Sequence, residues 1–266
     1  MALSINGELT KLANDYYISL DSTEGKSITS SLSSLTAKLK AHFGQDLKEV
    51  IEFGSYKRDT ILPRRFDEHS DVDLMIVFNH KSINVNPSTY RKYLQDFCDK
   101  YYPNSIVYKS KPTVVLELVK IKYDLVAAYQ QQSGWSGSVT TYIPKSDTEW
   151  MTTDPHGFNK LLSDKNGNNK HLIKPLSRLM KAWNASAGYP IESFSLEKEI
   201  VNTGFFSSTL EEYFFSMINN MTRYRDTVSA STKVTALKDN AAKVKQALNN
   251  NNGIQAKTWL SHILPI

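Results

Sequence analysis

The chain changes character near Trp150, and this change constrains its fold more than any other feature. Short apolar runs rich in β-branched residues predict strands at 50–53, 72–78, 113–119 and 123–128. Apolar spacing predicts helices at 8–20, 27–43 and 88–102, and after Trp150 only helical patterns remain, at 156–164, 170–187, 193–203, 207–224, 230–250 and 254–263. We therefore predict an α+β fold, in which residues 1–150 form a domain with a mixed sheet and helices and residues 151–266 form a helical domain.

The composition excludes several classes of protein. The 266 residues are 40% hydrophobic and 22% charged, which is typical of a globular chain and not of a disordered or fibrous one. The single cysteine, Cys98, cannot form an internal disulfide, and the N-terminus lacks the charged and apolar regions of a signal peptide. Both features lead us to expect a cytoplasmic protein. No apolar run approaches the roughly 18 residues of a membrane-spanning helix, so we expect no membrane partner.

Positive charge is concentrated at the C-terminal end. Residues 221–266 contain seven Lys or Arg and two Asp. The net charge of this segment is therefore +5, the same as that of the whole chain. Such a region could contact nucleic acid through its phosphates, or it could be a solvated helix face. The sequence leaves both interpretations open.

Two acidic residues precede a strongly apolar run. Asp71 and Asp73 flank Val72, and the five apolar residues 74–78 follow. Because side chains alternate along a strand, both carboxylates project to the same side. Carboxylate oxygens are ligands that Mg²⁺ prefers, often together with substrate phosphates, whereas one Cys and six scattered His offer no zinc site. The pair therefore predicts a magnesium site.

A site with two metal ions usually has a third acid, and the chain offers two candidates. Glu117 and Asp124 lie in the two strands after the acidic pair, and Lys120 and Lys122 mark a turn between them. A hairpin at this turn could bring either acid beside the first two. The spacing alone does not choose between them.

Gly54 and Ser55 follow the first predicted strand and precede a short helical pattern. A helix start exposes backbone amides to a phosphate, glycine permits close approach, and a serine hydroxyl adds a donor. We expect this turn to bind a nucleotide phosphate.

These motifs, in this order, resemble those of the nucleotidyltransferase superfamily of the DNA polymerase β type. The resemblance rests on Gly54-Ser55, Asp71-x-Asp73 and Asp124 on successive strands. The segments LSRLMKAWN (176–184) and ESFSLE (192–197) narrow it to the bacterial cGAS/DncV-like nucleotidyltransferases (CD-NTases, SMODS group). The similarity covers roughly residues 25–220.

The resemblance implies a polymerase β-like core, a C-terminal helical lobe and an active site in the cleft between them. It also selects Asp124, because DLVAA (124–128) is similar to the family's third-carboxylate strand, with Ala127 in place of the family's proline. Asp71, Asp73 and Asp124 would hold two Mg²⁺ ions, or Mn²⁺, and Asp124 would also be the nearest base.

The same resemblance assigns three nucleotide-binding residues in the second half of the chain. Lys181 would reach the β- and γ-phosphates, Ser193 would donate to the same group, and Phe194 would stack on a base. The competing interpretations are a lysine with a buried stem, an N-cap serine and a core phenylalanine.

The implied reaction joins nucleoside triphosphates, including ATP, into a cyclic or linear oligonucleotide with release of pyrophosphate. By family analogy, the product would activate a separate effector protein in antiphage (CBASS-like) signalling. Two alternatives are a nucleotidyltransferase that modifies RNA, a protein or a small molecule, and a nucleotide sensor without activity. The intact acids argue against the sensor, because three clustered carboxylates without metal ions repel one another.

Overall fold

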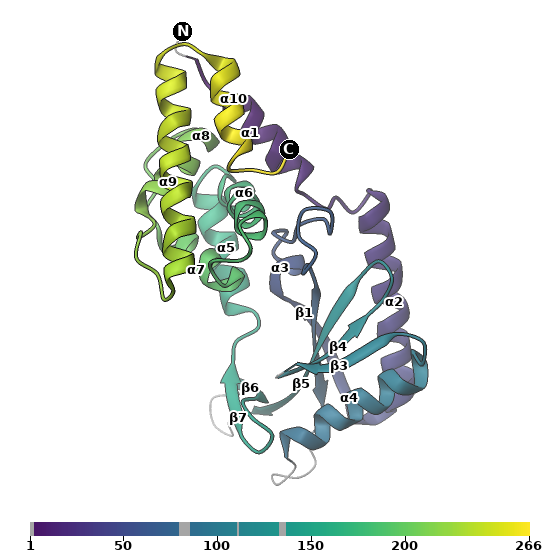
Figure 1. The fold of residues 1–266 in the computed structure, drawn as a ribbon. Coiled ribbons are helices and arrows are strands. Elements are labelled where there is room, and N and C mark those ends of the chain that lie inside the picture. The colour runs from purple at the N-terminus through teal and green to yellow at the C-terminus, as the bar shows by residue number, and fades with distance from the viewer. Residues whose placement is uncertain (1–2, 80–85, 111, 133–136) are drawn as a thin grey trace. The chain divides into compact units, whose positions relative to one another are not determined.

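The computed structural model describes residues 3–79, 86–110, 112–132 and 137–266, and the chain forms two compact units (Figure 1). We call Ile18–Arg58 with Ser70–Lys160 the sheet unit. Met1–Tyr17, Asp59–His69 and Leu161–Ile266 form the helical unit. The sequence predicted domains of 1–150 and 151–266; the units defined by packing draw segments from both sides of that boundary.

The sheet unit contains a mixed sheet, as predicted. Its strands are β1 (Leu47–Phe53), β2 (Val72–Phe78), β3 (Ile106–Ser110), β4 (Thr113–Glu117), β5 (Lys122–Gln132), β6 (Val139–Pro144) and β7 (Trp150–Thr153). The order is β1-β2-β5-β4-β3, and β6 joins the far end of β5 and pairs with β7. Strands β2 and β5 are parallel, whereas the other pairs are antiparallel.

The four predicted strands and the β4–β5 hairpin are confirmed, but β3, β6 and β7 were not predicted. Strand β3 is mostly exposed, so its residues lack the apolar run that identifies a buried strand. Strand β7 begins at Trp150, after which the sequence predicted only helices. It is defined by its pairing with β6. Such short outer strands depend on their partners more than on their own sequence.

Helices α2 (Thr23–Phe43) and α4 (Pro87–Tyr101) pack on the sheet and against each other. Helix α2 begins four residues before its predicted start, because the Ser22 hydroxyl caps it by accepting from the Gly25 amide. The short elements η1 (Gly44–Asp46) and α3 (Gly54–Lys57) precede and follow β1.

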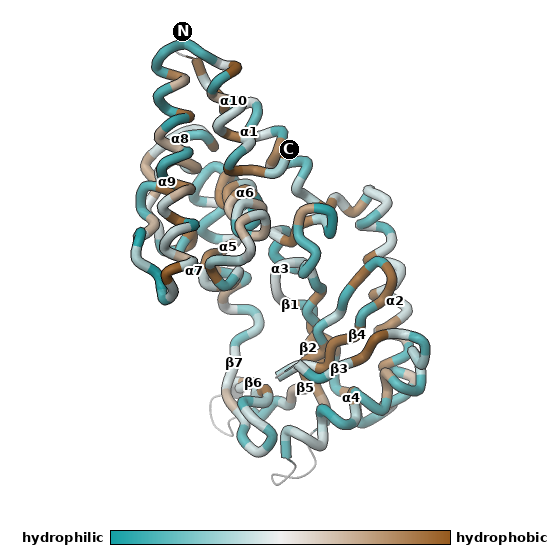
Figure 2. The backbone as a smooth tube through the Cα atoms, viewed as in Figure 1, coloured by the Kyte–Doolittle hydropathy of each residue, from teal (hydrophilic) through white to brown (hydrophobic). Residues whose placement is uncertain are grey.

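Strand β2 is the centre of this core. All of its residues are buried except Asp73, which is partly exposed, and Figure 2 shows hydrophobic colour on the central strands. Phe78 contacts the rings of Phe43 and Tyr90, whereas Met75 and Val77 pack with β1 and β5 in a separate cluster. Because side chains alternate, Asp73 shares the face of Met75 and Val77 and lies opposite the face that α2 and α4 cover.

The helical unit contains α1 (Asn6–Asp15), most of α5 (Gly157–Asn168), α6 (Ile173–Ser186), α7 (Ser193–Asn202), α8 (Leu210–Asn220), α9 (Val228–Asn249) and α10 (Gly253–Ser261). All six helices predicted after Trp150 are confirmed. Helix α6 packs on α1, α7 and α8, and α10 packs on α9. Within the described ranges, none of the helices is both long and apolar enough to cross a membrane.

Candidate active site

The parallel register of β2 and β5 places two of the predicted acids side by side. Asp73 pairs with Asp124, and Val72 pairs with Tyr123. Residues paired directly across a sheet point to the same face, so both carboxylates lie on the face opposite α2 and α4. Glu117, the other candidate, lies on β4, which β5 separates from β2. The structure therefore brings Asp124, and not Glu117, next to Asp73.

Asp71 lies one residue before β2 and contacts a lysine from β5. The Lys122 Nζ is 3.1 Å from the Asp71 Oδ2, and the two side chains are 16% and 27% exposed. The charge of Asp71 also acts on Asp124. The three predicted acids therefore lie within one electrostatic neighbourhood, together with a lysine.

The Asp124 carboxylate is partly buried and has a shifted pKa. Its Oδ1 is buried and has no hydrogen-bond partner among the described residues. Burial, reinforced by the charge of Asp71, raises the pKa of Asp124 from 3.8 to about 6, although Lys122 and a hydrogen bond with Thr113 act in the opposite direction. A carboxylate with such a pKa binds a proton or a cation more readily than an ordinary aspartate.

Gly54 lies against the Asp73 carboxylate. Its φ of 71° is left-handed, and a Cβ added to it would lie 1.7 Å from the Asp73 Oδ2. Only glycine fits this position, because any side chain would displace the carboxylate. Gly54 begins α3, and Ser55 follows it in that helix. The predicted phosphate-binding turn is therefore packed directly on one of the predicted metal ligands.

The donor set fits a hard divalent cation. Within the described ranges, no three His, Cys, Asp or Glu side chains are already grouped as a metal centre. The available donors are nevertheless carboxylate oxygens, and the unpartnered Asp124 Oδ1 is a buried acceptor that a cation would satisfy. Asp71, Asp73 and Asp124 are thus the residues that would hold such ions.

The helical unit carries the other three predicted residues. Lys181 lies on α6 and is only 5% exposed. Ser193 is the first residue of α7, but Glu192 is the N-cap and accepts hydrogen bonds from the amides of Phe194 and Ser195. The N-cap interpretation of Ser193 is therefore wrong. Phe194 is 37% exposed, which excludes a core role, and the Lys198 Nζ lies 4.2 Å from its ring centroid.

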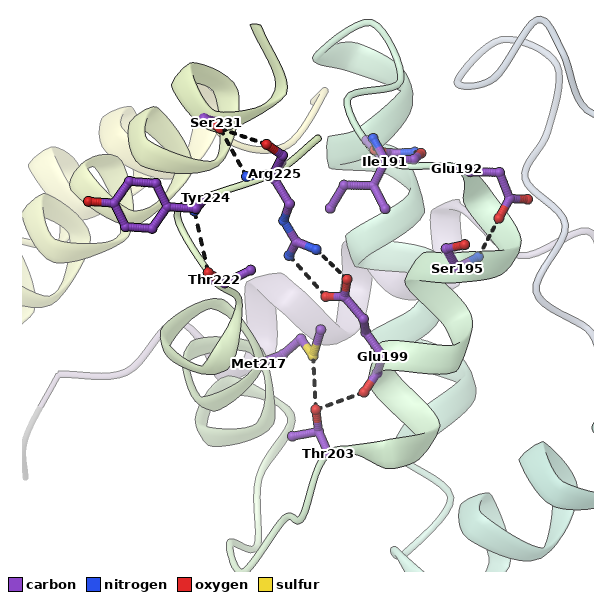
Figure 3. A network of polar contacts seen from close by, with 11 residues as sticks. Ile191, Glu192, Ser195, Glu199, Thr203, Met217, Thr222, Tyr224, Arg225 and Ser231 are labelled. Carbon is purple, nitrogen blue, oxygen red and sulfur yellow. Dashed lines mark hydrogen bonds and ion pairs between the residues drawn. The ribbon is translucent and has the colours of Figure 1, made fainter. Parts of the chain in front are cut away.

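Two polar contacts support α7. The Arg225 guanidinium binds both carboxylate oxygens of Glu199, with 3.0 Å between Nη2 and Oε2 (Figure 3). Before α7, the buried Asn184 side chain bonds the amide and carbonyl of Ile191 at 3.1 and 2.7 Å. Sequence reasoning missed the roles of Arg225 and Asn184. A side-chain amide that is buried and hydrogen-bonded to the backbone has no sequence signature. In the sequence, Arg225 is one of several cations in the basic C-terminal region, and nothing there indicates its pairing with Glu199.

The basic C-terminal region is largely occupied by contacts within the helical unit. Six of its seven cations have an intramolecular contact: Arg223 with Asp239, Arg225 with Glu199, Lys238 with the Asn219 carbonyl, Lys243 with the Trp259 ring, Lys245 with the Phe215 ring and Lys257 with Glu8. Nucleic-acid contact by this region stays a prediction.

The family model described as the Second Messenger Oligonucleotide or Dinucleotide Synthetase (SMODS) domain matches residues 3–166, which is more than half of the chain. No curated protein matches the sequence.

Solved structures share the fold over nearly the whole chain. CdnG of Bradyrhizobium diazoefficiens, in complex with GTP, is 10% identical with a TM-score of 0.69, and the match covers 98% of this chain and 99% of that chain. CdnC of E. coli MS115-1, with ATP, is 15% identical with a TM-score of 0.68, covering 97% and 96%. The CdnE c-UMP-AMP synthase of Rhodothermus marinus is 17% identical with a TM-score of 0.61, covering 88% and 96%.

The family match and the shared fold agree with the predicted resemblance. The polymerase β-like arrangement of a mixed sheet with helices and a C-terminal helical region is confirmed. The chain belongs to the Second Messenger Oligonucleotide or Dinucleotide Synthetase family and is a nucleotidyltransferase with the fold of the bacterial cGAS/DncV-like synthases.

Proposed function

We propose that this nucleotidyltransferase depends on two divalent metal ions held by Asp71, Asp73 and Asp124. The pairing of Asp73 with Asp124 across parallel strands carries the proposal, because it supplies adjacent carboxylates on one face of the sheet. When bound, Mg²⁺ or Mn²⁺ would lower the pKa of the attacking ribose hydroxyl and neutralise the triphosphate and the leaving pyrophosphate. Its substrates are nucleoside triphosphates, with ATP expected among them.

Asp124 is the candidate general base. Its raised pKa of about 6 lies closer to neutral pH than that of an ordinary aspartate, while the group is still ionised at pH 7. Gly54 lets the chain pass close to Asp73, and Ser55, the next residue, would donate to a phosphate of the same nucleotide.

Lys181, Ser193 and Phe194 would bind the rest of the nucleotide. A buried ammonium requires an anionic partner, and a triphosphate would supply one for Lys181. The Ser193 hydroxyl does not serve as the cap of α7, which supports a role as a phosphate donor. Phe194 offers an exposed ring for a base, and stacking of this kind is worth roughly 1–3 kcal/mol.

The product would be a cyclic or linear oligonucleotide that activates a separate effector protein. Structural relatives support this proposal: CdnG was solved in complex with GTP, and DncV of Vibrio cholerae was solved in complex with a linear intermediate. A role in antiphage defence, in the cytoplasm, follows from the family resemblance.

Product analysis tests this function. Purified protein is incubated with labelled ATP, GTP, CTP and UTP and with Mg²⁺ or Mn²⁺, and the products are resolved after phosphatase treatment. We expect a phosphatase-resistant species with metal and none with chelator. Label found only on added RNA or protein would favour an acceptor-modifying enzyme, and no transfer at all would contradict the proposal. The Asp71→Ala/Asp73→Ala protein is the inactive control.

A further inference from the structure

Lys122 occupies a special position beside the three acids. It is the first residue of β5, two residues before Asp124, so both side chains lie on the same face of the strand. Its Nζ is 3.1 Å from the Asp71 Oδ2. The side chain is 16% exposed, which is unusual for lysine, a residue that is normally solvated.

The three carboxylates differ in what stabilises them. Asp71 has the Lys122 ammonium. Asp73 packs against the bare backbone of Gly54. Asp124 has a buried Oδ1 without a partner among the described residues. Lys122 is thus a cation that acts on both Asp71 and Asp124.

Electrostatics explains why the lysine lies there. Like charges in a partly buried site repel one another, and one cation within reach offsets that repulsion. The Lys122 Nζ supplies that cation, because it lies 3.1 Å from the Asp71 Oδ2 and is largely shielded from solvent. The ammonium is therefore paired with Asp71 in the metal-free protein.

We propose that Lys122 is an internal counter-ion of the acid cluster, which holds Asp71 in the metal-free protein and must release it when a divalent cation binds. Lys122 is then a positioning residue that sets the metal affinity of the site. The inference rests on the proposed function, because it assumes that Asp71 is a metal ligand.

The competition has a direct consequence. A divalent cation that binds Asp71 must displace the ammonium, so part of its binding free energy is used to break the ion pair. Without Lys122 this cost disappears, and the cluster also becomes more negative. Removal of the lysine charge should tighten metal binding and weaken the metal-free fold.

The test compares Lys122→Gln with Lys120→Gln. Lys120 is exposed in the turn between β4 and β5, so its substitution changes the net charge equally but leaves the ion pair between Lys122 and Asp71 in place. Mn²⁺ binding to the nucleotide-free protein is measured by electron paramagnetic resonance, and melting temperature is measured with chelator and with Mg²⁺. Lys122→Met, which keeps the length of the stem, replaces Lys122→Gln if that variant does not fold.

We expect Lys122→Gln to bind Mn²⁺ about three- to tenfold more tightly than the parent, as fits the loss of one partly buried ion pair. Its melting temperature should fall in chelator and rise more than that of the parent on addition of Mg²⁺. Lys122→Arg, which retains the charge, and Lys120→Gln should both bind Mn²⁺ like the parent.

One result would overturn the inference alone: a Mn²⁺ affinity of Lys122→Gln that equals or falls below that of Lys120→Gln. If Lys122→Gln then also bound nucleotide more weakly, Lys122 would be a phosphate ligand and not a counter-ion. Failure of the parent itself to bind Mn²⁺ would instead contradict the proposed metal site.

Discussion

The acid cluster and helix α7 hold their candidate functional residues in different ways. On the sheet, the backbone register places Asp73 beside Asp124, so strand pairing decides the geometry. At the start of α7, Ser193 and Phe194 depend on side chains: Glu192 caps the helix and Arg225 binds Glu199. The positions of the acids therefore depend mainly on the backbone, whereas the position of α7 depends on several side chains. Each of those side chains can be removed separately.

The largest expected effect comes from removing the acids themselves. Asp71→Ala with Asp73→Ala should lower turnover by at least about three orders of magnitude, because groups that act as a unit fail together. The fold should remain intact, because the relief of repulsion with Asp124 offsets the loss of the ion pair between Asp71 and Lys122. Product formation and circular dichroism check the two parts. Loss of folding would mean that these acids are structural.

Gly54→Ala tests whether the backbone alone positions Asp73. The new Cβ would overlap the Asp73 carboxylate and also strain a left-handed residue. We expect turnover to fall by roughly two orders of magnitude, in line with the cost of misplacing a reacting group. Steady-state kinetics measures it.

Gly188→Ala is the matched control for Gly54→Ala. Gly188 has a φ of 80°, but nothing lies within 4 Å of an added Cβ. It therefore reproduces the backbone strain without the collision. Equal losses of activity in the two variants would remove the role assigned to Gly54.

Arg225→Ala tests the side-chain support of α7. It leaves Glu199 partly buried without its partner, and we expect the free energy of unfolding to fall by about 2–3 kcal/mol. Urea denaturation measures the loss. Arg223→Ala breaks the exposed pair with Asp239 and should cost under about 1 kcal/mol. If both variants lose the same amount, α7 does not depend on Arg225.

The smallest effect concerns pH and Asp124. Its pKa is higher in the folded chain than in the unfolded chain, so the folded state binds more protons between about pH 4 and 6. The free energy of unfolding that this group contributes therefore falls as pH rises through that window. In chelator at pH 8, Asp124→Asn should be more stable than the parent by about 1–2 kcal/mol, with little difference at pH 4.

Thermal melting at both pH values measures the Asp124 effect. Asp21→Asn, at an exposed position, is the control and should show no such difference. A parent that is more stable than Asp124→Asn at pH 8 in chelator would contradict the electrostatic description of the site.

The place of the acids on the sheet could be predicted in part because its signals are local. A continuous apolar strand headed by Asp71 and Asp73, and a hairpin before Asp124, are visible in the sequence itself. The choice of Asp124 over Glu117 was not visible without the family, because it depends on which strand of the hairpin lies next to β2.

The remaining features depend on contacts between distant residues. Lys122 appeared in the sequence only as a sign of a turn, although its two-residue spacing from Asp124 placed it on the same strand face. Glu199 and Arg225 are 26 residues apart, and they meet only because the segment between α8 and α9 returns to α7. Strand β7 likewise exists only through its pairing with β6.

Mn²⁺ stoichiometry in the presence of a non-hydrolysable ATP analogue tests the central claim most directly. If Asp71, Asp73 and Asp124 form the metal site, the parent should bind two Mn²⁺ ions per chain, and a protein with both Asp73→Asn and Asp124→Asn should bind neither at the same concentrations. Equal binding by the two proteins, or none by the parent, would contradict the account.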